Sequence, residues 1–273
     1  MQQSYRQLPL TFEPRERYTF DALIAGRNRL AVDLVRRMAA GDGEKQILVW
    51  AGRGFGKSHL LQAACNYAAQ SKLTACYLPA KELLESPVQV FEGLEQLDMV
   101  CIDDVDVMMS STQWEEALFD LINRVRNAAG RILLAAGMSP ETCPIHLADL
   151  RSRLSWGPVF HLQELDDSDK IKAMKQRAQQ SGLEMADNVA NYLLTHYPRA
   201  LFDLFERLDH LDKALEIIRD RQPQQGSSRR GATGSGGSVR RRWSDRSGRG
   251  CAARPGTPGS AAFRSGMKSP GPG

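Results

Sequence analysis

"WAGRGFGKSHL" occupies residues 50–60 and joins two segments of different kinds. It follows the apolar run QILVW (46–50), which is typical of a short buried β-strand, and it leads into a helical pattern from Lys57 to about Gln70. A glycine-rich turn between a strand and a helix is the setting in which a phosphate-binding loop forms. The stretch therefore predicts an α/β fold that binds a nucleotide.

The individual positions of this loop suit phosphate chemistry. Three glycines let the backbone bend so that several N–H groups point inward, next to the positive end of the following helix: Gly52, Gly54 and Gly56. Lys57 would reach the β- and γ-phosphates, Ser58 would ligate Mg²⁺, and His59 is a further candidate for cofactor contact, with a structural role as its alternative. Ala51 replaces the glycine of the strict pattern, which is acceptable unless that residue needs a positive φ angle. The alternative for the whole stretch is a glycine-rich connector with an incidental lysine.

An apolar run that ends in two acids follows about 45 residues later. In MVCIDD (99–104), Asp103 would hold the magnesium ion through water, and Asp104 would orient an attacking water. Taken alone, the same run also fits an ordinary acidic loop at a strand end. Combined with the glycine-rich loop, it predicts the second half of a nucleotide site.

Apolar runs and helical patterns alternate through the first 163 residues. The expected strands are 46–50, 74–78, 99–104, 131–136 and 159–162, and the expected helices are 28–40, 57–70, 81–86, 112–129 and 146–155. This alternation predicts a five-stranded parallel sheet with helices on both faces. Three further helical patterns, at 166–182, 186–197 and 198–220, predict a small all-helical domain.

Composition separates the body of the chain from its tail. Residues 221–273 hold 11 Lys and Arg but a single acid, leaving 25 basic and 31 acidic residues in residues 1–220, a net charge of −6. The tail is rich in Arg, Gly, Ser and Pro, so we expect it to be disordered. A DNA-binding basic arm and an out-of-frame translation both explain it, and the second is favoured because no periodic pattern appears.

Cellular context is indicated by features that the sequence lacks. The five cysteines are dispersed without a CxxC pair, as in a reduced cytoplasmic protein. No run of 18 apolar residues and no secretory signal is present, so neither a membrane span nor export is expected.

Five stretches resemble the AAA+ family and, within it, the bacterial DnaA family with its Hda-type regulators. They are YTFDALIAGRNRLA (18–31), GRGFGKSHLLQAA (52–64), VCIDDVD (100–106), LRSRLSWG (150–157) and RALFDLFERLDHLDKA (199–214). The resemblance implies an AAA+ P-loop fold with a helical lid, binding ADP or ATP with Mg²⁺. It divides the chain into an N-terminal peptide (1–16), a nucleotide-binding domain (17–163), a lid (164–220) and the tail (221–273).

The resemblance also implies roles for three residues. Arg153 would be an arginine finger that acts in trans on a nucleotide in a neighbouring subunit, with Arg151 the less favoured choice. Arg199 would be the lid arginine that senses bound phosphates. Met138 stands near the end of a strand where relatives carry a polar sensor, usually Asp. Because methionine cannot usefully hydrogen-bond a phosphate or water, efficient hydrolysis by this chain is not expected.

QLPLTF (7–12) is similar to the peptide with which bacterial proteins dock on the DNA polymerase III β sliding clamp. Gln7 would enter a polar pocket, and three apolar side chains would enter a groove: Leu8, Leu10 and Phe12. The alternative is a first β-strand that packs on the core.

Together the resemblances imply a regulator of replication initiation. It would bind nucleotide, dock on the clamp, reach DNA through the clamp, and stimulate ATP hydrolysis by DnaA so that re-initiation is prevented. Its location would be the cytoplasm, at the replisome, and the family also admits a homo-oligomer. No helix-turn-helix region is seen after the lid, so an initiator of the usual kind is not expected. The alternative is a self-acting AAA+ ATPase, such as a helicase loader, or a DnaA-like DNA-binding initiation factor.

Overall fold

The structure, a computed structural model, describes residues 18–210. Two predictions therefore lie outside the described residues: the clamp-binding peptide at 7–12 and the disordered tail at 221–273. The end of the lid beyond residue 210 lies outside them as well.

A five-stranded parallel sheet forms the centre of the first domain, as predicted. Its strands are β1 (Gln46–Trp50), β2 (Ala75–Pro79), β3 (Met99–Asp103), β4 (Arg131–Ala136) and β5 (Val159–His161). The strands lie in the order β2-β3-β4-β1-β5, and every pairing is parallel. This order places the carboxyl ends of β1 and β3, where the two predicted parts of the nucleotide site follow, at the same edge of the sheet.

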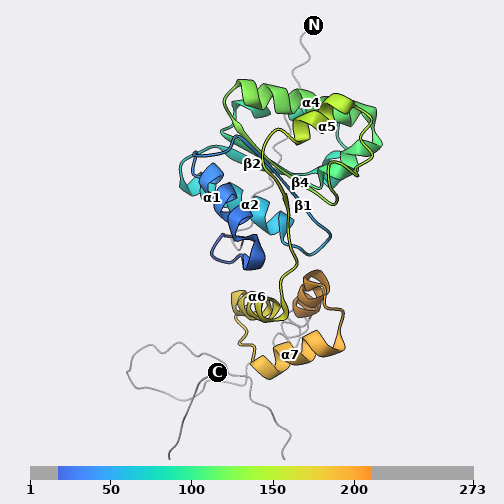
Figure 1. The fold of residues 1–273 in the computed structure, drawn as a ribbon. Helices are drawn as coiled ribbons and strands as arrows, with labels where there is room; N and C mark the ends of the chain where they lie inside the picture. The colour runs from blue at the N-terminus through green and yellow to red at the C-terminus, as the bar shows by residue number, and fades with distance from the viewer. Residues whose placement is uncertain (1–17, 211–273) are drawn as a thin grey trace, which may run out of the picture. The chain divides into compact units, whose positions relative to one another are not determined.

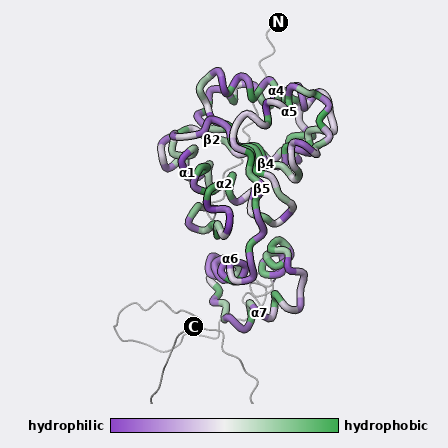
Figure 2. The backbone as a smooth tube through the Cα atoms, in the orientation of Figure 1, coloured by the Kyte–Doolittle hydropathy of each residue, from purple (hydrophilic) through white to green (hydrophobic). Residues whose placement is uncertain are grey.

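The two faces of the sheet carry separate apolar cores. Ile47 and Val49 pack with helices α1 and α2 on one face, while Leu48 packs with α4 and α5 on the other. Figure 1 shows these helix pairs on opposite sides of the strands, and Figure 2 shows that the hydrophobic backbone concentrates on the strands between them. Alternate side chains of a strand point to opposite faces, so an unbroken apolar run is what a sheet covered on both sides requires.

The helices of this domain follow the predicted order with shifted ends. They are α1 (Arg29–Ala39), α2 (Lys57–Gln70), α3 (Ala80–Leu83), α4 (Thr112–Asn127) and α5 (Ala148–Leu154). Short 3-10 turns lie at η1 (Gly26–Asn28), η2 (Val88–Phe91), η3 (Leu94–Gln96) and η4 (Val105–Ser110). The helix predicted at 81–86 instead spans Ala80–Leu83, and Pro87 disfavours helical backbone only at Ser86, the residue before it.

The lid is helical, as predicted. Helix α6 (Asp167–Gln180) begins after Asp166, whose carboxylate accepts a hydrogen bond from the Asp169 N–H. Helix α7 (Asp187–His196) follows, and a third helix begins at residue 201, three residues later than predicted. The apolar core of the lid consists of Met174, Ala190, Leu193, Leu194, Leu204 and Leu208.

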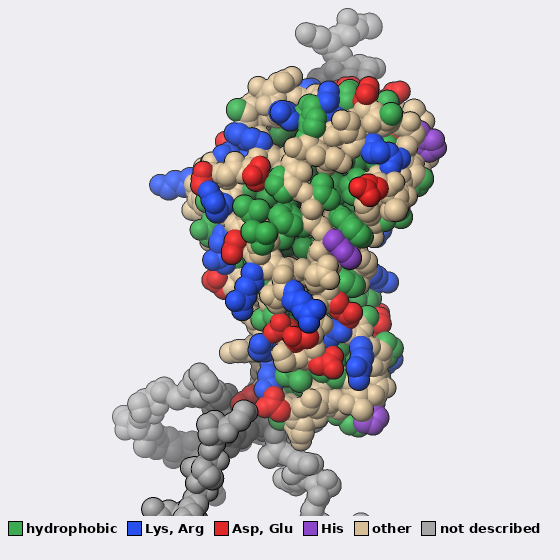
Figure 3. Space-filling view, in the orientation of Figure 1, with side chains coloured by type: hydrophobic (Ala, Val, Ile, Leu, Met, Phe, Trp, Pro, Cys, Tyr) green, Lys and Arg blue, Asp and Glu red, His purple; other side chains and the backbone are tan. Residues whose placement is uncertain are grey.

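On the face shown in Figure 3, basic and acidic side chains are interspersed. Among the helices formed within residues 18–210, none combines the length and the apolar character needed to cross a bilayer.

Candidate nucleotide-binding site

The glycine-rich loop adopts the backbone that its sequence predicts. Gly54 and Gly56 have φ angles of 88° and 86°, in the left-handed region that glycine enters without a steric penalty. Ala51 is buried and is not among the residues with positive φ, so its side chain is compatible with the loop. Its N–H donates to the Ala136 carbonyl on β4, which ties the start of the loop to the sheet.

Lys57 points its amino group into the loop. The side chain is only 7% exposed, and Nζ donates to the carbonyls of Ala51 at 2.8 Å and Gly52 at 2.9 Å. The two carbonyls offset the positive charge of Lys57 only in part. A phosphate held by the backbone N–H groups of the loop would supply the negative charge that the lysine lacks.

The acid that ends β3 lies beside the loop. Asp103 is 3% exposed, accepts from the Tyr77 hydroxyl at 2.8 Å, and accepts from the Asp104 N–H at 3.0 Å. Burial raises the pKa of Asp103, although hydrogen bonds from Ser58 and Tyr77 act in the opposite direction. Ser58 and Asp103 are thus brought together, and a hydroxyl beside a carboxylate is a donor set that Mg²⁺ accepts directly or through water. No local pattern in the sequence indicates Tyr77, which β2 places next to β3.

The second acid, Asp104, also has a partner that no local sequence pattern indicates. Asp104 has φ 53°, unusual for a residue other than glycine, and its carboxylate lies 2.6 Å from Lys81 Nζ. Asp106 accepts from the Gly137 N–H at 2.6 Å, just beyond the end of β4. Met138 follows Gly137, and its 39% exposed side chain has no group that forms strong hydrogen bonds. The carboxylate beside the end of β4 is that of Asp106.

The glycine-rich loop with Lys57 and Ser58 lines one cavity of about 780 Å³, together with Lys81, Asp104 and Asp106. One wall is the apolar segment near Leu23 and Val32, the floor is the glycine-rich loop, and the lid contributes Arg177 and Phe205. This volume lies within the range of sites for small molecules and cofactors. A nucleotide in the cavity would contact both the α/β domain and the lid.

Two predicted cofactor-binding residues, His59 and Arg199, contact other parts of the protein. His59 borders the cavity, and its Nε2 is 3.0 Å from the Thr19 carbonyl, a contact that ties the N-terminal segment to α2. Arg199 is not among the residues that line the cavity. Its side chain is 67% exposed and its Nη1 lies 3.6 Å from Asp167, so its predicted role in sensing phosphates stays a prediction.

The third lid helix packs directly on the loop. The Arg53 guanidinium lies 3.5 Å from the centre of the Phe202 ring, and a Cβ atom added to Gly54 would lie 3.1 Å from Phe202 Cβ and 3.2 Å from its backbone nitrogen. Gly54 is therefore required both by its φ angle and by the approach of the lid.

We expect Gly54→Ala to lower the free energy of unfolding by about 1–3 kcal/mol, through left-handed strain and overpacking against Phe202. Gly52→Ala is the matched control, because its Cβ would meet only the Phe55 ring at 3.5 Å and its φ is not positive. That variant should stay within about 0.5 kcal/mol of the parent chain. Urea unfolding followed by circular dichroism measures both, and equal losses would contradict the role given to Phe202.

The predicted finger segment lies at α5. Arg153 Nε donates to Asn123 Oδ1 at 3.0 Å, and the guanidinium stacks 3.7 Å from the centre of the Trp156 ring. Arg126 lies over the same ring at 3.9 Å. Among residues 18–210, the contacts of the Arg153 guanidinium are an amide oxygen and aromatic rings, none of them negatively charged.

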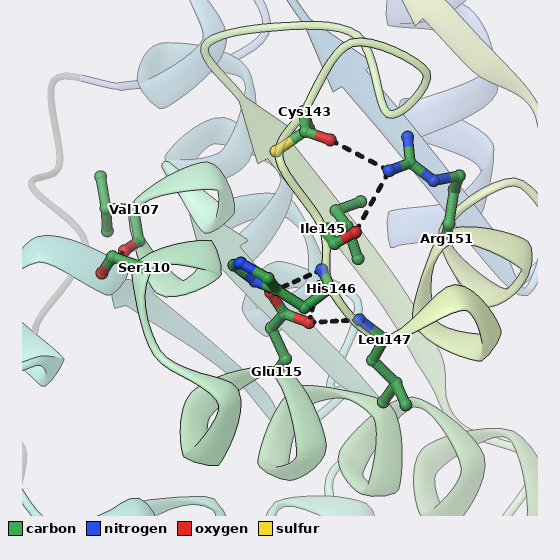
Figure 4. A network of polar contacts seen from close by, with 8 residues as sticks. All are labelled: Val107, Ser110, Glu115, Cys143, Ile145, His146, Leu147 and Arg151. Carbon is green, nitrogen blue, oxygen red and sulfur yellow. Dashed lines mark hydrogen bonds and ion pairs between the residues drawn. The ribbon is translucent and has the colours of Figure 1, made fainter.

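Arg151 faces a different environment from Arg153. Its guanidinium donates to four backbone carbonyls of the segment before α5: those of Pro140, Glu141, Cys143 and Ile145. The last two contacts are drawn in Figure 4. Arg151 therefore holds the connection between β4 and α5, which is a structural role.

A buried carboxylate holds the same segment from the other side (Figure 4). Glu115 on α4 is 0% exposed and accepts from the N–H groups of His146 at 3.1 Å and Leu147 at 2.7 Å. Its Oε1 also lies 3.0 Å from His146 Nδ1. The helix predicted to start at residue 146 instead starts at Ala148, because Leu147 has an extended backbone with φ −81° and ψ 102°.

Burial alone would raise the pKa of Glu115, but the hydrogen bonds from His146 and Leu147 together hold it below its usual value. We expect Glu115→Gln to lower the free energy of unfolding at pH 7 by about 1.5–3 kcal/mol, the value of hydrogen bonds to a charged group. Because the pKa of Glu115 is lower in the folded chain than in the unfolded chain, where it is about 4.3, the ionised carboxylate stabilises the fold above that pH. This stabilisation is lost as the pH falls through the pKa of the folded chain. The difference between the two chains should therefore shrink below about pH 4.3.

Urea titrations at several pH values test this expectation. The exposed neighbour Glu116 supplies the control, and Glu116→Gln should change little at any pH. A Glu115→Gln chain as stable as the parent at pH 7 would contradict the structural role of the carboxylate.

A parallel sheet in this order, a glycine-rich loop between β1 and α2, and a helical lid beside the loop define a domain with the AAA+ fold. The family model of the bacterial DnaA ATPase domain matches residues 15–161, and that of the Hda lid domain matches residues 167–217. The chain belongs to the bacterial DnaA ATPase family and carries a lid of the Hda type.

Similar proteins agree with this assignment. An uncharacterized protein of Haemophilus influenzae is 36% identical over 211 residues, which are 77% of this chain and 91% of that protein. Domain III of the Thermotoga maritima replication initiation protein DnaA superposes with a TM-score of 0.67 at 22% identity, covering 77% of this chain and 92% of that one. AMPPCP-bound DnaA from Aquifex aeolicus gives 0.59 at 23% identity, covering 75% and 70%. The two structures share the fold.

Proposed function

We propose that this chain is a nucleotide-bound regulator that stimulates ATP hydrolysis by DnaA and so prevents re-initiation of replication. The observation that carries the proposal is the position of Arg153. It stacks on Trp156 with no negatively charged contact among the described residues, and it is absent from the lining of the chain's own nucleotide cavity. A cation presented in this way suits a nucleotide held by another subunit.

Adenine nucleotide with Mg²⁺ is the proposed cofactor of the cavity. The DnaA of Aquifex aeolicus, which shares the fold, is described with the adenine nucleotide analogue AMPPCP. In this chain Lys57 and the loop N–H groups would hold the phosphates, and Ser58 with Asp103 would hold the ion, which offsets phosphate charge. Lid contact at Phe202 would make the pose of the lid depend on the nucleotide.

The chain itself is proposed to hydrolyse ATP slowly. Met138 offers no hydrogen-bonding group at the position where the family resemblance implies a polar sensor, and Asp104 is engaged by Lys81. Both features favour a subunit that holds its nucleotide and acts on the nucleotide of DnaA. They count against the alternative of a self-acting ATPase such as a helicase loader.

The segment 7–12 is proposed to dock on the β sliding clamp, with Gln7 in a polar pocket and the apolar side chains of Leu8, Leu10 and Phe12 in a groove. Attachment to a clamp on DNA would raise the local concentration of the chain near DnaA at the replisome, without any new contact to DnaA.

Purified chain, DnaA–ATP, clamp and DNA together test the proposal. We expect faster release of phosphate from DnaA–ATP, and the acceleration should depend on the clamp and on residues 7–12. A clamp pull-down with Leu10 and Phe12 replaced by alanine checks the docking step separately. Unchanged DnaA hydrolysis with a chain that binds both nucleotide and clamp would refute the regulatory function.

A further inference from the structure

Trp156 is a large apolar side chain that remains 39% exposed, just after the end of α5. Two guanidinium groups lie over its ring: that of Arg153 on α5, 3.7 Å from the ring centre, and that of Arg126 on α4, at 3.9 Å. Helices α4 and α5 lie on the same face of the sheet (Figure 1). The two cations repel each other, and the negative faces of the indole ring, which attract cations, offset this repulsion. The ring therefore fixes where the Arg153 guanidinium lies.

The turn that carries this ring is anchored to the sheet. The Trp156 N–H donates to the Arg153 carbonyl at 3.2 Å, which brings the ring back beside the Arg153 side chain. Gln46 begins β1 and is 7% exposed, and its Nε2 donates to the carbonyls of Arg153 at 2.6 Å and Leu154 at 3.3 Å. A Cβ atom added to Gly157 would overlap the Gln46 carbonyl, so the chain after the ring also lies directly against β1. The position of the ring thus depends on the fold and not only on a chance surface rotamer.

An arginine that reaches toward another subunit has many rotamers, and only some of them direct its guanidinium at a nucleotide held there. Ordering such a side chain at the moment of binding costs conformational entropy. Arg153 is ordered beforehand, by its hydrogen bond to Asn123 Oδ1 at 3.0 Å and by the Trp156 ring. Neither an amide oxygen nor an aromatic ring carries a net charge, so the full positive charge of the guanidinium stays available to a phosphoryl group.

We propose that Trp156 is a positioning residue that holds the Arg153 guanidinium oriented for the nucleotide of a neighbouring DnaA subunit. The inference rests on the proposed function. Trp156 does not itself contact the reacting phosphoryl group and acts through Arg153. Removing the ring should therefore lower the maximal rate of DnaA–ATP hydrolysis that the chain induces. A residue that only docks on DnaA would instead change the concentration of chain that gives half of this rate.

Trp156→Leu keeps an apolar side chain but removes the ring. We expect the maximal rate of DnaA–ATP hydrolysis to fall about tenfold, with the half-maximal concentration within about twofold of the parent value. Trp156→Phe restores an aromatic face, and its maximal rate should stay within about threefold of the parent rate. Tyr192→Leu is the matched control, because Tyr192 is 53% exposed and stacks on His196 at 4.1 Å but lies on α7 in the lid. Thermal melting shows that each variant is folded.

A second background shows whether Trp156 acts through Arg153. In a chain that carries Arg153→Ala, adding Trp156→Leu should leave the Kd for DnaA–ATP on clamp-loaded DNA unchanged, since the oriented guanidinium is gone. Three results would overturn the inference while leaving the proposed function intact: a parental maximal rate in Trp156→Leu, an equal loss in Trp156→Phe, or weaker binding of the double variant. A parent chain that does not stimulate DnaA–ATP hydrolysis would overturn the proposed function itself, and this inference with it.

Discussion

Lys57→Ala is expected to weaken ADP binding about 100-fold. The expected loss of about 3 kcal/mol is the upper value for hydrogen bonds to a charged group, and each 1.4 kcal/mol corresponds to a factor of ten in Kd. Lys57 is 7% exposed and donates to two loop carbonyls, so its amino group already lies where a phosphate would be held. Isothermal titration with ADP and Mg²⁺ measures the change.

Lys45→Ala is the matched control for this loss. Lys45 also donates to a backbone carbonyl, that of Ala129 at 2.7 Å, but it is exposed and lies away from the cavity. Its removal should leave the Kd for ADP within about twofold. Because Lys57 is buried, thermal melting of Lys57→Ala must accompany the titration. A well-folded Lys57→Ala chain that binds ADP like the parent would contradict the proposed phosphate site.

The sequence predicts the loop and the acid strand because each is a local pattern. The glycines, the lysine and the serine of the loop all lie within residues 50–58. MVCIDD combines an apolar run, which indicates a buried strand, with two acids at its end. The contacts that complete the site join neighbouring strands. Tyr77 on β2 and Lys81 just after it reach the acids because β2 lies beside β3, and Asp106, which follows β3, meets the Gly137 N–H because β4 lies on the other side of β3. Strand order is not encoded in any single stretch.

The sequence does carry a signal that Glu115 is buried. Its spacing to Leu118, Ile122 and Val125 places it on the apolar stripe of α4, where a charged residue needs hydrogen-bonding partners. The partners themselves, at residues 146 and 147, were not predictable, because they depend on the path of the loop between β4 and α5.

Arg151 and Arg153 could not be distinguished by pattern alone. Residues two apart on a helix point in different directions, but the sequence does not show which direction faces a partner. In the structure the Arg151 guanidinium donates hydrogen bonds to four backbone carbonyls, whereas Arg153 makes one side-chain hydrogen bond and aromatic contacts. The geometry therefore supports the preference for Arg153 as the finger, which remains a proposal.

Arg153→Ala is expected to reduce the stimulation of DnaA–ATP hydrolysis about 1000-fold, or to the basal rate of DnaA if that is reached first, because arginine fingers contribute at least that factor. The Kd of the chain for ADP should not change, since Arg153 does not line the cavity. The rate of phosphate release from DnaA–ATP, in the presence of clamp and DNA, is the measurement.

Arg126→Ala is the matched control, because Arg126 stacks on the same Trp156 ring at 3.9 Å but lies on α4. It should retain most of the stimulation. Arg151→Ala should instead lower the melting temperature, since four carbonyls lose their donor. The proposal is contradicted if Arg151→Ala melts like the parent but no longer stimulates DnaA–ATP hydrolysis, while Arg153→Ala still does. In that case Arg151 is the finger, and α5 presents a different face to DnaA from the one proposed.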